Sequence, residues 1–327
     1  MKKLLQLHNL SVGYKNTVLI NAINASINEG EFVVVLGKNG VGKSTLINSI
    51  LGFEKFLDGE IYIENSLIKT LSTKSIAQKI AVVLPKLVNV PKIKVFDLVV
   101  TARLPYSKTL KNLSIQESNQ INDLFKLVGI DNLKDKYANE LSEGQLQLVM
   151  ILRAFCQDTS LIILDEPTSN LDLENQLKIF KLLKDLKAKT NKSFLMITHE
   201  VDLALQFADK VWWIENQHLK QGLPEEIAFQ YQIISKLSGN HLVYHPALKN
   251  YSNIELNQNK IKVVGDSELS FWVRKGLERI GYTLSDSDVK VIEVTEKNII
   301  FEHENFESID SFLNYIQHEK HYHNRSE

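Results

Sequence analysis

A glycine-rich segment between a predicted strand and a predicted helix has the residue types of a phosphate-binding loop. It reads Gly37-Lys38-Asn39-Gly40-Val41-Gly42-Lys43-Ser44-Thr45 and fits the pattern G-x-x-x-x-G-K-[ST]. Glycines let backbone N–H groups approach phosphate oxygens closely, and the N-terminus of the following helix adds positive potential. Lys43 can reach the β- and γ-phosphates of a nucleotide, and the Ser44 hydroxyl can ligate Mg²⁺. We expect seven loop residues to contact the nucleotide: Gly37, Asn39, Gly40, Gly42, Lys43, Ser44 and Thr45.

Two adjacent acids, Asp165 and Glu166, follow the buried apolar run Leu161–Leu164. Successive strand residues point to opposite sides, so the two carboxylates cannot have the same role. Asp165 suits Mg²⁺ ligation, which leaves Glu166 to orient or deprotonate an attacking water. The alternative is a pair of surface acids at a strand end, and a phosphate-binding loop on the same sheet argues against it.

Four short apolar runs have the length and composition of buried strands, and predicted helices separate them. A doubly wound α/β core with a parallel sheet is the fold class that this order favours. A turn is expected at Ser11–Tyr14, and the chain between about 91 and 155 is mostly helical, which predicts a lobe inserted between strands. The four runs are Phe32–Leu36, Ile80–Leu84, Leu161–Leu164 and Phe194–Ile197, with helices near Lys43–Leu51, Leu146–Phe155 and Leu173–Lys187.

The pattern changes after Gly222. Polar, turn-rich segments precede alternating apolar runs with one helical stretch between them, which predicts a small α+β domain. We therefore expect a nucleotide-binding domain over residues 1–240, with its helical subdomain at about 86–158, and an accessory domain over 248–327. The histidine-containing tail near His318 and His323 is expected to be a solvated, disordered segment rather than a metal site, because no carboxylate or cysteine framework surrounds it.

The composition narrows the classes of protein. There are 38 basic and 39 acidic residues, a balance that disfavours nucleic-acid binding. The single cysteine, Cys156, suits a reducing compartment and is expected to be a small apolar filler on a helix. No apolar run approaches the roughly 18 residues of a membrane span. If the protein works at a membrane, another chain must bring it there.

The segment Leu141-Ser142-Glu143-Gly144-Gln145 precedes a predicted helix and lies shortly before the strand that ends in Asp165. It resembles the signature motif of ABC (ATP-binding cassette) ATPases, usually written LSGGQ. Taken alone, a capped helix would be the commoner meaning of this pattern. The resemblance extends over about residues 3–235 and implies a P-loop NTPase that binds ATP and Mg²⁺. It also implies a head-to-tail homodimer in which Ser142, Gly144 and Gln145 contact the ATP of the opposite subunit.

Three further positions match motifs of the same family. Ser169-Asn170-Leu171-Asp172 resembles the D-loop, so Asp172 is expected near the shared nucleotide. His199, after the last core strand, is similar to the switch histidine that contacts the γ-phosphate; the alternative is an ordinary core or surface histidine. Tyr14 matches the aromatic residue that stacks on adenine, and a purely structural role is the alternative.

Two positions depart from the family pattern. Lys86 stands where a glutamine near Mg²⁺ is usual, which places the metal geometry and the coupling to the helical lobe in doubt. Glu143 replaces the first signature glycine, and its side chain is expected to point away from the nucleotide, since acids are favoured in the first turn of a helix.

The resemblance implies an ATP-hydrolysing subunit that powers an ABC transporter through a transmembrane permease, on the cytoplasmic face of the membrane. The run from Val95 to Tyr106 is similar to ATPases of iron–siderophore, haem and cobalamin importers, although Ala102 replaces their usual glycine. Zinc and manganese importers share part of this run. Two alternatives remain: a soluble, non-transport ABC ATPase, and a catalytically weak nucleotide-binding regulator.

Overall fold

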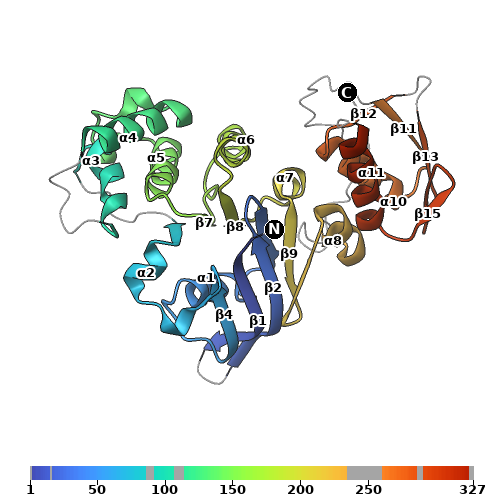
Figure 1. The fold of residues 1–327 in the computed structure, drawn as a ribbon, viewed down its shortest axis with the longest axis horizontal. Helices are drawn as coiled ribbons and strands as arrows, with labels where there is room; N and C mark the ends of the chain where they lie inside the picture. Colours follow the sequence, from blue (N-terminus) through green and yellow to red (C-terminus); the bar gives the residue numbers. More distant parts are fainter. Residues whose placement is uncertain are drawn as a thin grey trace. The chain divides into compact units, whose positions relative to one another are not determined.

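The computed structural model describes residues 2–14, 17–85, 92–106, 114–233, 260–285 and 290–323, with side chains to residue 317. The chain forms two compact units (Figure 1). The first unit contains Met1–Leu203 and Trp212–Lys220, and the second contains Ala204–Val211 and Gln221–Glu327.

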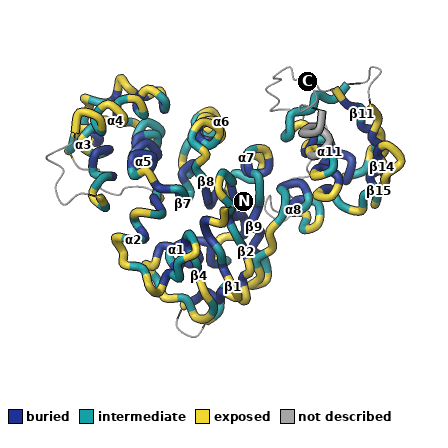
Figure 2. The backbone as a smooth tube through the Cα atoms, in the orientation of Figure 1, coloured by how far each residue is buried: buried dark blue, intermediate teal, exposed yellow. Residues whose placement is uncertain are grey.

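A six-stranded sheet forms the centre of the first unit. The strands β6, β7, β8 and β3 are neighbours, and each pair among them is parallel, as the apolar runs predict. Every residue of β3, β7 and β8 is buried, and Figure 2 shows this buried centre around β7 and β8. The order is β10 (His218–Gly222), β9 (Lys210–Glu215), β3 (Phe32–Gly37), β8 (Ser193–Ile197), β7 (Leu161–Asp165) and β6 (Ile80–Val83).

Helices follow the central strands. A short loop leads from each of three central strands to a helix. The helix α1 (Lys43–Ile50) follows β3, α6 (Leu173–Thr190) follows β7, and α7 (Val201–Phe207) follows β8. The helix α6 is amphipathic, because its buried residues recur at helical spacing. They are Ile179, Phe180, Leu183 and Leu186.

A second sheet of four strands is antiparallel where it pairs, which the sequence analysis did not predict. Its order is β2 (Thr17–Asn28), β1 (Lys3–Tyr14), β4 (Asp58–Ile63) and β5 (Ser66–Leu67). The prediction of a turn at Ser11–Tyr14 is wrong, because β1 continues to Tyr14, which pairs with Thr17. Register shifts between β1 and β2 accommodate Gly13, where a Cβ atom would lie 2.0 Å from the Thr17 carbonyl oxygen.

The segment between β6 and β7 is mostly helical where the structure describes it, as predicted (green in Figure 1). Capping boxes begin α4 and α5, which explains why these helices start at serine residues. The rings of Phe96 and Phe125 stack at a centroid distance of 6.2 Å, which packs α3 against α4. The helices are α3 (Val95–Val100), α4 (Ile115–Val128) and α5 (Glu143–Cys156), with short 3-10 turns at Thr101–Arg103, Asp131–Leu133 and Ala138–Glu140.

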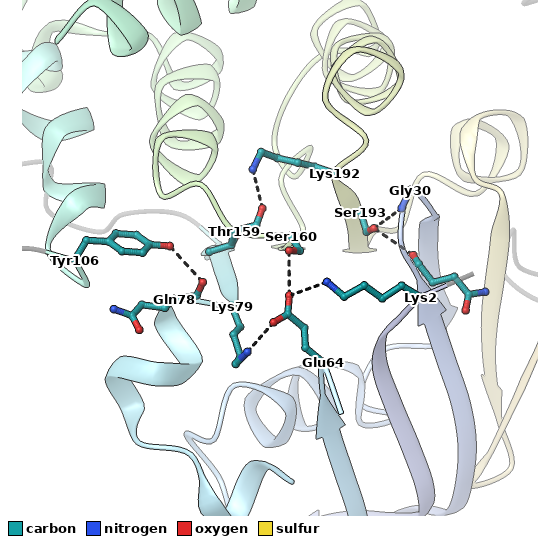
Figure 3. A network of polar contacts seen from close by, with 11 residues as sticks. Lys2, Gly30, Glu64, Gln78, Lys79, Tyr106, Thr159, Ser160, Lys192 and Ser193 are labelled. Atoms are coloured by element: carbon teal, nitrogen blue, oxygen red, sulfur yellow. Dashed lines mark hydrogen bonds and ion pairs between the residues drawn. The ribbon is translucent and has the colours of Figure 1, made fainter. Parts of the chain in front are cut away.

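A polar network ties the antiparallel sheet to the start of the central strands (Figure 3). Glu64, in the β4–β5 turn, accepts hydrogen bonds from Lys79 Nζ at 2.6 Å and from Ser160 Oγ at 3.1 Å. Burial alone would raise the pKa of Glu64, but the hydrogen bonds from Lys79 and Ser160 and the charge of Lys79 lower it below its usual range. The ionised carboxylate therefore joins β4 to the residues that begin β6 and β7.

The second unit packs helices against one face of a mixed five-stranded sheet. Inward residues of the strands are buried, including Ile261, Ile292 and Phe301. Glu225, at 2% side-chain exposure, forms a two-contact ion pair with Arg279 at 2.6 and 3.2 Å. The strand order is β12 (Thr283–Leu284), β11 (Lys260–Val264), β13 (Val291–Val294), β14 (Ile299–Phe301) and β15 (Glu304–Phe306), and the helices are α8 (Pro224–Tyr231), α10 (Glu268–Arg279) and α11 (Ile309–His323).

The helix α11 runs to His323, so the backbone of the histidine-containing tail is helical to that residue rather than disordered as expected. The helix α8 belongs to the second unit, because the chain re-enters that unit at Gln221.

Candidate active site

The loop between β3 and α1 is organised by its own lysine. Lys43 is 6% exposed, and its Nζ donates to the carbonyl oxygens of Gly37 at 2.7 Å and Lys38 at 3.2 Å. Gly42 precedes the helix with φ 108°, a conformation that a residue with a Cβ atom rarely adopts. Lys43 therefore links the two ends of the loop by hydrogen bonds to these carbonyl groups.

The N-terminus of α1 suits an anion. No side chain caps it among the described residues, and its first turn carries no acid. Its first N–H groups therefore lack the usual side-chain partners, and phosphate oxygens can accept from them. Ser44, Asn39 and Gly40 are exposed at this end of the helix.

Tyr14 ends β1 close to the same loop. The Thr45 hydroxyl donates to the Tyr14 phenol oxygen at 2.8 Å. The Tyr14 residue is 52% exposed. Its hydroxyl is thus fixed to the start of α1, while much of its ring surface remains available for stacking on a base.

Asp165 is the last residue of β7 and is 6% exposed. Its Oδ1 has no hydrogen-bond partner among the residues that the structure describes. Burial, with the charge of Glu166, raises the pKa of Asp165 to about 6, and the charges of Lys43 and His199 offset this only in part. A buried carboxylate oxygen without a donor is the ligand type that Mg²⁺ prefers, so the residue fits a divalent cation.

Glu166 and His199 lie within hydrogen-bond distance, with Glu166 Oε1 and His199 Nε2 at 2.8 Å. The strand register explains why they meet. Asp165 pairs with Ile197 across β7 and β8, so the residues that follow each strand lie at the same edge of the sheet. The Glu166 N–H donates to the Ile197 carbonyl at 3.0 Å, and Glu166 has φ 49°, a strained backbone conformation of a kind that clusters at functional sites.

Four residues near this pair were not singled out from the sequence. The buried hydroxyls of Thr168 and Thr198 lie 3.3 Å apart, and Gln176 Nε2 donates to Glu200 Oε1 at 2.8 Å. Both contacts join the segment after β7 to the segment after β8. No local sequence pattern reveals these contacts. The Thr168–Thr198 contact depends on the pairing of β7 with β8, and the Gln176–Glu200 contact depends on the placement of α6 beside the segment after β8.

The signature residues form a second group at the start of α5. Ser142 Oγ accepts from the Gln145 N–H at 3.3 Å, and Gln145 Oε1 accepts from the Ser142 N–H at 3.2 Å. A Cβ atom on Gly144 would lie 3.6 Å from Asn175 in α6. Asp172 caps α6 by accepting from the Asn175 N–H at 2.8 Å, so the starts of α5 and α6 lie together.

The structure thus brings together Lys43, Asp165, Glu166 and His199, and it places Tyr14 beside the phosphate-binding loop. Lys86 lies outside the described residues. Glu143 is in the first turn of α5 and is exposed.

Comparisons with known proteins identify the family. Residues 20–169 match the family described as ABC transporter, and residues 258–317 match the family described as iron ABC transporter C-terminal domain. An uncharacterised ABC transporter ATP-binding protein of Methanocaldococcus jannaschii is 35% identical over 264 residues, which cover 79% of this chain and 89% of that protein. The petrobactin import ATP-binding protein FpuD of Bacillus anthracis is 33% identical and covers 69% of this chain and 84% of its own length.

A solved structure described as a metal-chelate type ABC transporter in an inward-facing conformation is also similar. It superimposes with a TM-score of 0.61 at 30% identity, covering 69% of this chain and 85% of that chain. In the described part of this chain, no helix is long and apolar enough to cross a membrane. The chain belongs to the family of ABC transporter ATP-binding proteins, and it is the ATPase subunit of such a transporter.

Proposed function

We propose that this chain hydrolyses ATP at the site built by Lys43, Glu166 and His199. The observation that carries the proposal is the 2.8 Å contact between Glu166 and His199. Glu166 would orient and deprotonate the attacking water, and His199 would hold the carboxylate and contact the γ-phosphate.

The phosphates of ATP would lie against the loop before α1. The proposed contacts are the N–H groups and side chains of Gly37, Asn39, Gly40, Gly42, Lys43, Ser44 and Thr45, with Tyr14 on the adenine. Ser44 and Asp165 would hold Mg²⁺, since the unpaired, buried oxygen of Asp165 fits a divalent cation. When bound, Mg²⁺ would neutralise charge on the β- and γ-phosphates.

Two copies of the chain would form a head-to-tail homodimer around two ATP molecules. The motif Ser142–Gln145 supports this arrangement, because the signature residues of one subunit face the ATP of the other in this family. Ser142, Gly144 and Gln145, together with Asp172, would complete each other's sites. The capping box at Ser142 and the cap at Asp172 fix these segments for that purpose.

The most specific proposal concerns the cargo. We infer import of an iron–siderophore, haem, cobalamin or related metal chelate through a transmembrane permease, with the chain on the cytoplasmic face. The relative FpuD is named for petrobactin import, and residues 258–317 match a domain named for iron transport. The domain division would be an ATPase domain at 1–240, with the helical subdomain at about 86–158, and an accessory domain at 248–327.

Uptake measurements test the cargo. Cells of the source organism that lack the gene would be supplied with wild-type chain or with Lys43→Ala, then offered a ferric siderophore, haem, cobalamin or spermidine. Restoration of uptake of one metal chelate by wild type and not by Lys43→Ala is the expected result. Normal uptake of all three chelates in the deleted strain, with lost spermidine uptake, would contradict metal-chelate import and leave the ATPase assignment intact.

A further inference from the structure

The segment after β8 lacks the hydrogen-bond ladder of the strand. Because β8 ends at Ile197, the backbone of residues 198–200 is not fixed by strand pairing. His199 lies in this segment and is 44% exposed at its side chain. Something other than the sheet must therefore keep its ring at 2.8 Å from Glu166.

The two neighbours of His199 are both anchored. Thr198 is 1% exposed. Its hydroxyl lies 3.3 Å from the hydroxyl of Thr168, which is two residues after Glu166 in the chain. The same Thr198 hydroxyl accepts from the Glu200 N–H at 3.1 Å. On the other side, the Glu200 carboxylate accepts from Gln176 Nε2 at 2.8 Å. The residue before His199 is thus anchored to the segment that follows β7, and the residue after it is anchored to α6.

Gln176 is itself fixed at the start of α6. Its N–H donates to the Asp172 carbonyl at 2.9 Å, and the Asp172 side chain caps the helix. Gln176 and Glu200 are half-buried. Burial raises the pKa of Glu200, and the charge of His199 and the hydrogen bond from Gln176 offset this rise only in part. A hydrogen bond to a half-buried carboxylate is stronger than one between neutral exposed groups.

We propose that Gln176 and Glu200 are positioning residues that fix His199 against Glu166 during ATP hydrolysis. The inference rests on the proposed catalytic function of that pair. Neither residue is proposed to touch the substrate. Their hydrogen bond, which joins α6 to the segment after β8, would act by holding His199 in place. Displacing a catalytic group by about 1 Å can lower a rate about 100-fold, so a small movement of residue 199 is enough to slow turnover.

A charge-swap series tests the pair. Gln176→Glu places two carboxylates where one donor and one acceptor meet, so they repel each other. Glu200→Gln keeps an acceptor oxygen for Gln176. The double variant Gln176→Glu/Glu200→Gln restores the hydrogen bond with its direction reversed. Lys178→Gln is the matched control, since it removes an exposed ion pair with Glu174 on the same helix.

We expect Gln176→Glu to lower kcat about tenfold or more with the Kd for ATP unchanged and the protein still folded, at most with a small fall in Tm from the repulsion. Glu200→Gln, which replaces the charged acceptor by a neutral one, should lower kcat less than Gln176→Glu does. The double variant should return kcat to near the wild-type value, and Lys178→Gln should match wild type. Wild-type kcat in Gln176→Glu would overturn the inference. So would a double variant as slow as Gln176→Glu, because the rate loss would then not act through this hydrogen bond.

A second readout does not depend on turnover. The imidazole ¹⁵N resonances of His199 can be assigned by their loss in His199→Gln and compared among the variants. Gln176→Glu should shift them, the double variant should return them, and Lys178→Gln should leave them in place. Unshifted resonances in Gln176→Glu would overturn the inference even if the wild type hydrolysed no ATP. Wild-type turnover by Glu166→Gln would instead contradict the proposed catalytic base.

Discussion

The substitution Asp165→Asn is expected to stabilise the ligand-free protein at neutral pH while removing a ligand for the proposed metal. Asp165 is 6% exposed, and its pKa is raised to about 6 by burial and by the charge of Glu166. An aspartate in the unfolded chain has a pKa of about 3.9. The difference of about two pH units corresponds to about 3 kcal/mol, because one pKa unit is about 1.4 kcal/mol.

The sign follows from proton binding. Between about pH 4 and pH 6 the folded protein keeps the proton on Asp165, whereas the unfolded chain has lost it. The free energy of unfolding of the wild type therefore falls as pH rises through this window and stays low above it. Asparagine has no charge to desolvate, although burying its amide costs about 1 kcal/mol. The net gain for Asp165→Asn is about 2 kcal/mol at pH 7.5. It falls to zero at about pH 4.5, and below that pH the variant is less stable than wild type by up to about 1 kcal/mol.

Urea unfolding between pH 4 and pH 8, without nucleotide or Mg²⁺, measures this difference. Trp272→Phe in every sample leaves Trp212 and Trp213, both in the first unit, as the fluorescent reporters. Asp185→Asn is the matched control, since Asp185 is an exposed aspartate of α6. A stability difference between Asp165→Asn and wild type that is the same at pH 4 and pH 7.5 would refute the reasoning.

Three further predictions concern single side chains. Glu64→Gln should lower the free energy of unfolding by about 1 kcal/mol at pH 7, because the charge interaction with Lys79 is lost. The pKa of Glu64 is lowered in the folded protein, so urea titrations should show this difference shrink and vanish as pH falls below the ordinary glutamate range and the folded carboxylate takes up its proton. Cys156 is buried, which raises the pKa of its thiol to about 12, so iodoacetamide at pH 8 should label it only in denaturant; labelling of the native chain would contradict this. Tyr14→Phe loses only the hydroxyl contact with Thr45 and should keep the Kd for ATP within about twofold of wild type. Tyr14→Ala also removes the ring, so it should raise the Kd about fivefold if the ring stacks on adenine. Equal Kd values for wild type and Tyr14→Ala, measured by calorimetry, would exclude stacking.

Much of the fold could be predicted because its strands are unambiguous. Continuous apolar runs such as Leu161–Leu164, separated by helices, are typical of buried strands of a parallel sheet, and the structure confirms the parallel pairs. The antiparallel sheet was missed for a physical reason. The residues of β1 at Ser11–Tyr14 include turn formers, but register shifts in the pairing with β2 let the strand continue through Gly13.

Part of the candidate site could likewise be predicted from the sequence, and part could not. The loop before α1 and the acids after β7 depend on local sequence, so their residue types reveal their positions in the chain. The contact of Glu166 with His199 depends on the strand order, since β7 and β8 must be neighbours and in register. The Gln176–Glu200 contact depends further on how α6 packs on the sheet, and no local pattern encodes that.

The most direct test of the account is the steady-state ATPase rate of the purified chain, measured for wild type, Glu166→Gln and Lys178→Gln in parallel. Glu166 lies 2.8 Å from His199 and beside Asp165. Loss of turnover in Glu166→Gln by about 100-fold or more, with the Kd for ATP retained and Lys178→Gln unchanged, is the predicted result. A Glu166→Gln variant that hydrolyses ATP at the wild-type rate would contradict the assignment of Glu166 as the catalytic base.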